Sequence, residues 1–433
     1  MASYDIQLRT YTAPDRSEIK RLITRPAMQK KELADIIDDV FSSVKNHGDQ
    51  AILELTEKFD KVKLETLVVS EEEIEAGVAA VGDALKTAID RAYDNIKKFH
   101  SHQRLAVQKI ETSPGVTCWQ EMRPIGRVGL YIPGGTAPLF STVLMLGVPA
   151  QVAGCQEVVL CTPPNQEGAV HPAILYAAQL CGIRQIYKAG GAQAIAGMVL
   201  GTEVIPQVYK IFGPGNQFVT AAKMKGLSHG VAIDLPAGPS EVVVYADASA
   251  RASFIAADLL SQAEHGIDSQ VVLVTTDASL PDRVSAELNR QLPHLSRAHT
   301  AMVSLSHAYA CVFEEVEAAY AFINEYAPEH LILSSDHAAE QIHLVDNAGS
   351  VFIGHYTPES AGDYASGTNH TLPTAAYARA YSGVSLDSFV KKITFQEISK
   401  AGIQDLGQTI ITMAKNEELT AHAHAVQIRL DQL

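Results

Sequence analysis

Residues 128–135 read Val-Gly-Leu-Tyr-Ile-Pro-Gly-Gly, a short apolar run that ends in a glycine-rich turn. The run at 128–132 has the length of a buried strand, and similar runs follow at 157–161, 185–188 and 208–212. Helical stretches such as 141–148 and 171–180 lie between them. Strands and helices that alternate at this spacing predict a parallel sheet covered by helices.

A second series of the same kind starts near residue 231 and predicts a second α/β lobe that faces the first across a cleft. Its expected strands are 241–245, 270–275, 301–305, 330–333 and 350–353, and its expected helices include 249–265 and 313–326. The first hundred residues and the tail after residue 386 are expected to be helical.

This pattern predicts four parts of the chain. We expect an N-terminal arm at 1–26, a first α/β lobe at 130–238 and a C-terminal helical tail at 385–433. The helical part at 27–129 is expected to group with a second lobe at 239–384.

Composition narrows the class of protein. Among 433 residues, 34 are Lys or Arg and 49 are Asp or Glu, which gives a formal charge of −15. This acidic balance argues against nucleic-acid and membrane-surface partners, because phosphate binding needs clustered basic residues. The chain has no apolar run of membrane-spanning length and no signal peptide, so we expect a cytoplasmic protein. The five cysteines form no CxxC pair and are expected to be reduced core residues.

Two short patterns carry ionisable side chains. Gln262 and His265 lie three residues apart near the end of an expected helix and project from one face, although such a pair is often only a polar surface feature. Glu329 and His330 follow Pro328 at a helix-to-strand junction. They suit an acid/base pair, with an ordinary charged turn as the alternative.

The stretch 358–370, Pro-Glu-Ser-Ala-Gly-Asp-Tyr-Ala-Ser-Gly-Thr-Asn-His, is too polar for a core segment and too varied for a linker. A long polar loop inside a compact domain usually binds something. Asp363, Asn369 and His370 are oxygen and nitrogen donors suited to a divalent cation. Some of them, with Gln262 and His265, would form a site without thiolate, for which zinc is the first expectation and Mn or Co is chemically tolerated.

Three glycine-rich turns in the first lobe follow expected strands. They are residues 131–135, 190–193 and 213–217, and they contain Tyr131, Gln193 and Asn216. Exposed amides at such turns favour a pyrophosphate, so they indicate a nucleotide crevice. None of them is a complete GxGxxG, because Phe218 stands where the third glycine would be, and structural turns are the alternative.

From about Arg127 to its end the chain resembles the histidinol dehydrogenase family. The most specific stretches are 131–143, 233–241 (IDLPAGPSE), 326–331 and 348–373. The resemblance implies an α/β fold of two incomplete Rossmann-like lobes with parallel-rich sheets, plus small helical N- and C-terminal segments. It also implies a homodimer in which the tail of one subunit completes the metal site of the other.

The resemblance assigns roles to individual residues. Zinc, one ion per subunit, would be held by Gln262, His265, Asp363 and His422, which would also face the substrate. Glu329 and His330 would be the catalytic pair. The expected NAD contacts are Tyr131, Gln193 and Asn216, and the expected contacts to L-histidinol are Ser240, Glu417 and again His330. His424 matches no ligand position, and Glu418 stands where many relatives carry glycine.

The implied reaction is the NAD-dependent, four-electron oxidation of L-histidinol through L-histidinal to L-histidine, in histidine biosynthesis. Three alternatives stay open from the sequence: oxidation of a different primary alcohol on the same scaffold, zinc-dependent hydrolysis with Glu329 as the base, and non-catalytic binding of a metal or nucleotide. The glycine-rich turns speak against hydrolysis, and the acid/base pair speaks against simple binding.

Overall fold

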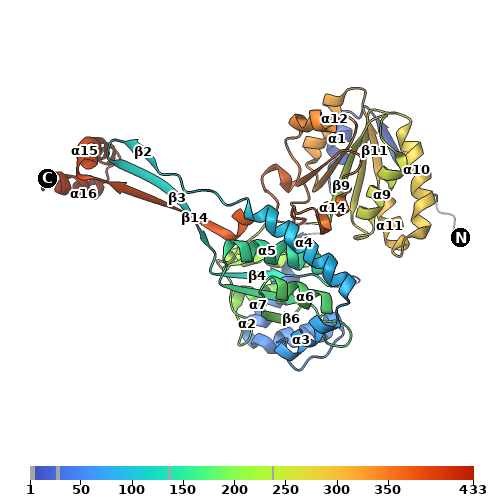
Figure 1. The fold of residues 1–433 in the computed structure, drawn as a ribbon, viewed down its shortest axis with the longest axis horizontal. Coiled ribbons are helices and arrows are strands. Elements are labelled where there is room, and N and C mark those ends of the chain that lie inside the picture. Colours follow the sequence, from blue (N-terminus) through green and yellow to red (C-terminus); the bar gives the residue numbers. More distant parts are fainter. Residues whose placement is uncertain (1–4, 26–29, 135–137, 237) are drawn as a thin grey trace.

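The computed structural model describes residues 5–25, 30–134, 138–236 and 238–433. Figure 1 shows two α/β lobes and a narrow arm that projects away from both. The lobes touch through the segment after α14 (Glu359–Tyr364), because Asn369 donates to the carbonyl oxygen of Met145 and His370 lies 3.2 Å from the hydroxyl of Thr142. The expected α/β fold with two parallel sheets is confirmed.

The first lobe contains a five-stranded parallel sheet in the order β6-β5-β4-β7-β8. Its strands are β4 (Arg127–Tyr131), β5 (Glu157–Thr162), β6 (Gln185–Lys188), β7 (Lys210–Phe212) and β8 (Ala232–Ile233). Separate apolar cores fill its two faces. This two-sided burial explains why these strands are apolar throughout instead of alternating with polar residues.

Helices from two parts of the chain cover this sheet. They are α2 (Lys30–Asp60), α3 (Glu71–Ala80), α4 (Asp83–Ser101), α5 (Phe140–Ala153), α6 (Pro172–Leu180), α7 (Gly191–Leu200) and α8 (Gln217–Ser228). The early helices pack on this lobe, α2 against α7, α3 against α6 and α4 against α5. The expected grouping of 27–129 with 239–384 is therefore wrong for these helices, because an amphipathic stripe does not reveal which lobe it covers.

The second lobe contains a six-stranded parallel sheet in the order β1-β11-β10-β9-β12-β13. Its strands are β1 (Arg9–Thr12), β9 (Glu241–Ala246), β10 (Gln270–Thr275), β11 (Tyr309–Val312), β12 (His330–Ser334) and β13 (Ser350–Ile353). The expected N-terminal arm thus supplies an edge strand and belongs to this lobe. The strand expected at 301–305 is wrong, since that segment is helical and its buried positions Ala301, Ser304 and Leu305 follow helical spacing.

The helices of the second lobe lie on both faces of its sheet, as Figure 1 shows for α9 and α12. They are α1 (Arg16–Leu22), α9 (Ala252–Ala263), α10 (Leu280–Gln291), α11 (Ala298–Leu305), α12 (Val316–Tyr326), α13 (Ala338–Gln341) and α14. The candidate site lies at the amino ends of β9 and β12, at one edge of this sheet.

The arm is a three-stranded antiparallel ribbon tipped by two helices. Its elements are β2 (Ile110–Ser113), β3 (Val116–Pro124), β14 (Val390–Ile398), α15 (Lys400–Asn416) and α16 (Thr420–Leu430). The expectation of a wholly helical tail is wrong for β14, which pairs with β3 along its full length. None of the helices among the described residues has the length and apolar character needed to cross a bilayer.

Candidate active site

A cluster of metal-ligand side chains lies where α9 meets α14. His265 follows the last turn of α9, and Glu359 and Asp363 lie four residues apart on α14. One ligand atom from each of these three residues lies within 4.8 Å of the other two. An imidazole and two carboxylates at this separation have the size and chemistry of a divalent-cation site.

Gln262 lies one turn before His265 and is fully buried. With its amide oriented to donate, the nitrogen lies 3.1 Å from Oε1 of Glu359 and 3.2 Å from the carbonyl oxygen of Glu241. The opposite orientation would set oxygen against oxygen. The amide oxygen is therefore the atom left for a ligand, which is the chemistry that a metal-binding glutamine requires.

Glu329 and His330 lie at the amino end of β12, with exposed fractions of 5% and 4%. Nδ1 of His330 donates to the carbonyl oxygen of Glu241 at 3.1 Å, and Oε2 of Glu329 accepts from the Glu241 amide at 2.8 Å. Because Nδ1 carries the proton, Nε2 is the basic nitrogen of the neutral ring. This nitrogen lies 3.6 Å from Oδ1 of Asp363 and thus faces the cluster.

The electrostatics of the cluster favour a cation. Burial raises the pKa of Glu329 and of Glu359 to about 8. Burial alone would lower the pKa of His330, but the carboxylates of Glu359, Glu329 and Asp363 together raise it to about 10. Although burial acts the other way, the His330 ring holds the pKa of Asp363 below its usual range. Several carboxyl groups share one imidazole here, so a bound divalent cation would offset excess negative charge.

Two buried polar atoms of the cluster have no hydrogen-bond partner among the described residues. They are Nε2 of His330 and Oε2 of Glu359. Orphaned buried polar atoms are costly, so their presence at one place indicates a polar ligand. The donor set of oxygen and nitrogen without sulfur fits zinc, and Mn or Co would also be tolerated.

Glu359 is the residue of this cluster that sequence reasoning missed. It lies four residues before Asp363 on a helix, and this spacing was the available signal. Asn369 and His370 were expected as donors, but their polar atoms are used elsewhere. Asn369 accepts from the Thr371 amide and donates to Met145, whereas His370 donates from Nδ1 to the carbonyl oxygen of Asp363 at 3.0 Å.

Ser240 immediately precedes β9. Because His330 pairs with Val242 of β9, Ser240 lies at the same amino-terminal edge of the sheet as the Glu329–His330 pair. It is half-buried, and its carbonyl oxygen accepts from the Gln270 amide at 2.9 Å. Its position agrees with a side chain that borders the cluster.

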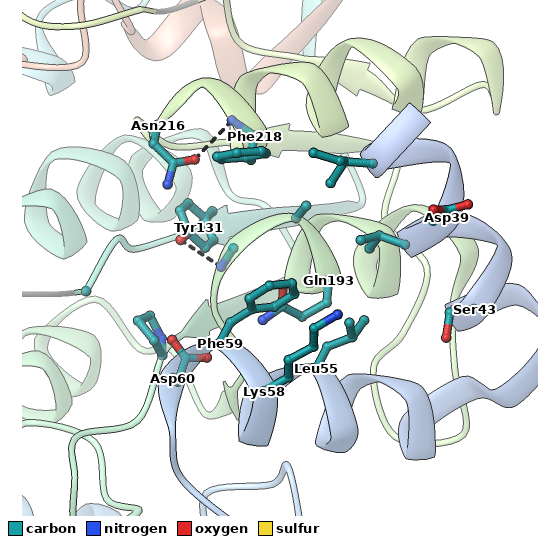
Figure 2. Close-up of a pocket in the computed structure, with 16 residues that line it drawn as sticks. Asp39, Ser43, Leu55, Lys58, Phe59, Asp60, Tyr131, Gln193, Asn216 and Phe218 are labelled. Carbon is teal, nitrogen blue, oxygen red and sulfur yellow. Dashed lines mark hydrogen bonds between the residues drawn. The ribbon is translucent and has the colours of Figure 1, made fainter. Parts of the chain in front are cut away.

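A cavity of about 730 Å³ lies in the first lobe, and Tyr131, Gln193 and Asn216 all line it. Figure 2 shows these three side chains, which come from the end of β4, the first turn of α7 and the residue that precedes α8. The hydroxyl of Tyr131 accepts from the Gly191 amide at 3.0 Å, and Asn216 caps helix α8. The amino ends of α7 and α8 thus open onto the cavity, a setting that favours a phosphate group.

The far wall of this cavity comes from the end of helix α2, through Lys58, Phe59 and Asp60. Sequence reasoning missed this wall, because α2 lies far from the glycine-rich turns along the chain. Gly135, which was expected in the first turn, lies outside the described residues.

A buried ion pair holds the turn that begins at Gly213. Oδ2 of Asp234 accepts from the Gly213 amide, and Nζ of Lys223 donates to the Gly213 carbonyl oxygen, both at 2.8 Å. Lys223 and Asp234 lie 2.5 Å apart with side-chain exposures of 3% and 0%. Gly213 has φ 132°, and a Cβ there would lie 2.1 Å from the Tyr131 carbonyl oxygen, so only glycine fits.

Glu417 and His422 lie elsewhere. Both are exposed on the tip of the arm, between and within α15 and α16, away from both lobes (Figure 1). One chain by itself therefore does not bring them to the cluster. Between them Glu418 has φ 61°, a left-handed backbone conformation that glycine adopts more easily than other residues.

Comparison with known proteins gives consistent matches along almost the whole chain. A family model described as Histidinol dehydrogenase matches residues 23–430. The histidinol dehydrogenase of Bacteroides thetaiotaomicron is 56% identical over 420 residues, covering 97% of this chain and 98% of that protein. That of Vibrio cholerae is 51% identical over 415 residues, 95% of each chain. A crystal structure of histidinol dehydrogenase from Elizabethkingia anophelis matches with a TM-score of 0.96 at 54% identity, covering 99% of both chains.

Proposed function

The chain belongs to the histidinol dehydrogenase family, and we infer from this premise that it oxidises L-histidinol to L-histidine with NAD and that the cluster at α9 and α14 is where it does so. The observation that supports this site most strongly is the cluster of His265, Glu359 and Asp363. Gln262 bonds to Glu359 beside this cluster, and Nε2 of His330 lies 3.6 Å from Asp363. The cavity in the first lobe would hold the cofactor.

The metal would be held by the amide oxygen of Gln262, the imidazole of His265 and the carboxylate of Asp363, with His422 of the partner subunit as the fourth ligand. Zinc, when bound, supplies a template for the imidazole and amino group of the substrate and a positive charge that offsets the surrounding carboxylates. Glu359 accepts a hydrogen bond from the amide nitrogen of Gln262, which would leave the amide oxygen of Gln262 free to bind the metal.

His330 would act as the general base for the alcohol. The surrounding carboxylates raise the pKa of His330 to about 10, and a bound metal would offset their charge and so lower this pKa. Nε2 would then be able to accept the hydroxyl proton of the substrate. Its other nitrogen stays bonded to the Glu241 carbonyl oxygen, which holds the ring in place. NAD, when bound, accepts the hydride in each of two successive oxidations.

Glu329 would serve the second oxidation. A carboxyl group with a pKa of about 8 exchanges protons efficiently near neutral pH, so Glu329 is suited to take a proton from the water that adds to the aldehyde. His330 would give the proton it took from the alcohol to the aldehyde oxygen as the water adds, and would then take the proton of the hydrate as the second hydride leaves. A covalent cysteine step is not needed, and burial raises the pKa of Cys155 to about 11 and of Cys311 to about 12.

We further propose that the working form is a homodimer whose arms are exchanged. The arm carries exposed apolar side chains, namely Ile110, Ile393, Ile398, Met413, Leu419 and Ile428. An elongated ribbon with such a surface is expected to pack against another chain. Exchange of this arm would carry Glu417 and His422 to the partner's cluster, so that activity would depend on assembly.

The proposal is tested by following NADH absorbance with zinc-loaded protein, L-histidinol and NAD, before and after chelation. We expect two NADH per histidinol, loss of activity with chelator and recovery with zinc. If the protein oxidises a simple primary alcohol or diol but does not oxidise histidinol, the substrate would be assigned as that other alcohol. Hydrolytic activity without NADH formation would indicate the hydrolase alternative.

A further inference from the structure

The backbone of one residue, Glu241, bonds to three of the site residues. The amide of Glu241 donates to Glu329, and its carbonyl oxygen accepts from both His330 and Gln262. Glu241 is the first residue of β9, and the ladder between β9 and β12 begins only at Val242. On the side of Glu241 that faces β12, the backbone amide and carbonyl groups therefore bond to side chains of the site and not to the neighbouring strand.

The side chain of Glu241 is held by an ion pair with Arg25. Nε and Nη2 of Arg25 lie 2.9 Å from Oε1 and Oε2 of Glu241, which is a two-pronged contact, with side-chain exposures of 11% and 1%. Arg25 also donates to the carbonyl oxygens of Ile23 and Tyr326 and stacks on the Tyr326 ring at 3.6 Å. The Ala375 amide donates to Oε1 of Glu241 at 3.0 Å.

The pair thus joins four segments that are far apart in sequence, and it does so directly behind the site. Its geometry is more than a simple charge contact, because a planar guanidinium fork fixes both the position and the rotation of the carboxylate. Since the side chain and the backbone belong to one residue, a fixed carboxylate also limits rotation of the two peptide units that flank the Cα of Glu241.

We propose that Arg25 and Glu241 are positioning residues for the oxidation, acting through the backbone amide and carbonyl groups of Glu241 on Glu329, His330 and Gln262. This inference rests on the proposed function of the cluster. Neither side chain is placed among the ligands or the acid/base pair. Their effect is to hold Nε2 of His330 and the amide oxygen of Gln262 at the right places.

The test compares Arg25→Met and Glu241→Gln with Leu292→Ala, a control in the same lobe that opens a cavity at a fully buried residue beyond α10. In Glu241→Gln the new amide group faces Nη2 of Arg25 and opens the fork while side-chain length is kept. The readouts are kcat, the KM values for histidinol and NAD, and the absorption spectrum of the Co²⁺-loaded protein, which reports on the ligand geometry independently of turnover.

We expect kcat to fall by about 10- to 100-fold in both variants, because misplacement of reacting groups by ~1 Å has effects of that order. The Co²⁺ bands should shift, and the KM for NAD should stay within about twofold, because the nucleotide cavity belongs to the first lobe. Leu292→Ala should melt at a lower temperature yet keep its kcat and Co²⁺ spectrum where it is folded.

The inference is overturned if either folded variant keeps kcat within twofold and an unchanged Co²⁺ spectrum. If Arg25→Met does not fold, Glu241→Gln decides alone. If the wild-type protein does not oxidise histidinol but the Co²⁺ bands still shift in the variants, the proposed function fails while the positioning role stands.

Discussion

Replacement of His330 by Asn isolates the role of one ring nitrogen. The Asn amide can still donate to the Glu241 carbonyl oxygen, where Nδ1 of His330 donates at 3.1 Å. It has no atom at the place of Nε2, which faces Asp363 at 3.6 Å and has no hydrogen-bond partner among the described residues. The substitution therefore removes the proposed base while it keeps the buried hydrogen bond.

Loss of a general base typically lowers turnover by ~10²–10⁴. At 1.36 kcal/mol per tenfold change, this corresponds to about 3–5 kcal/mol of transition-state stabilisation. The assay is NADH formation at saturating histidinol and NAD, with zinc content measured on the same sample. We expect His330→Asn to keep one zinc per subunit and to lose turnover by this factor, and Glu329→Gln to behave similarly.

A His330→Asn variant with kcat within about threefold of the wild type would refute the assignment of His330 as the base. Loss of zinc from the variant would instead show that His330 supports the metal site. Both results are visible in one experiment because metal content and turnover are measured together.

Three further predictions concern the metal, the charges and the cofactor turn. His422→Ala should lose zinc affinity and turnover, whereas the control His424→Ala should keep both. Zinc affinity is measured by chelator competition and turnover by NADH formation. Equal behaviour of the two variants would contradict the assignment of His422 as a zinc ligand. In the metal-free protein the folded-state pKa values of Glu329 and Glu359 are about 8, above their unfolded values near 4.5. The stability that these two groups contribute is therefore present below pH 4.5 and is lost as the pH rises through 8. The melting temperature of the metal-free protein should therefore fall between pH 5 and 8.5, less steeply in Glu359→Gln, and a rise over this range would contradict the predicted protonation. Lys223→Met leaves a buried carboxylate unpaired beside the Gly213 turn, which should cost ~3–5 kcal/mol in unfolding free energy and raise the KM for NAD; an unchanged KM in folded protein would refute the role of the turn.

The α/β pattern could be predicted from the sequence because strands buried on both faces are apolar throughout. Local pattern failed where an apolar run was short, as at 301–305, which is helical. It also failed for β1 and β14, whose strand character depends on partners that are distant in sequence. The assignment of α2, α3 and α4 to the first lobe depends on tertiary packing that periodicity does not encode.

The residues of the candidate site were likewise predictable where they form a local sequence pattern and were missed where they depend on tertiary contacts. The helical spacing of Gln262 and His265 and the adjacent Glu329 and His330 were visible in the sequence as local patterns. Glu359 was missed, although it shares a helix face with Asp363, because its neighbours from α9 are nearly a hundred residues away. The contribution of the arm tip could be inferred only from family resemblance, since residues that act in another subunit leave no local signal.

The central claim is that each site combines the second lobe of one subunit with the arm of the other. Mixing His330→Asn subunits with His422→Ala subunits tests it most directly, after dissociation and reassembly or by co-expression. Each variant alone should be nearly inactive, because one lacks the base and the other lacks a ligand. In mixed dimers, the intact lobe of the His422→Ala subunit would receive an intact arm from its partner.

A random 1:1 mixture should then recover about a quarter of the wild-type NADH formation, because half of the dimers are mixed and each has one complete site. This recovery should appear together with tight zinc binding at the complete site. A mixture that stays as inactive as the two variants alone would contradict a site shared between subunits.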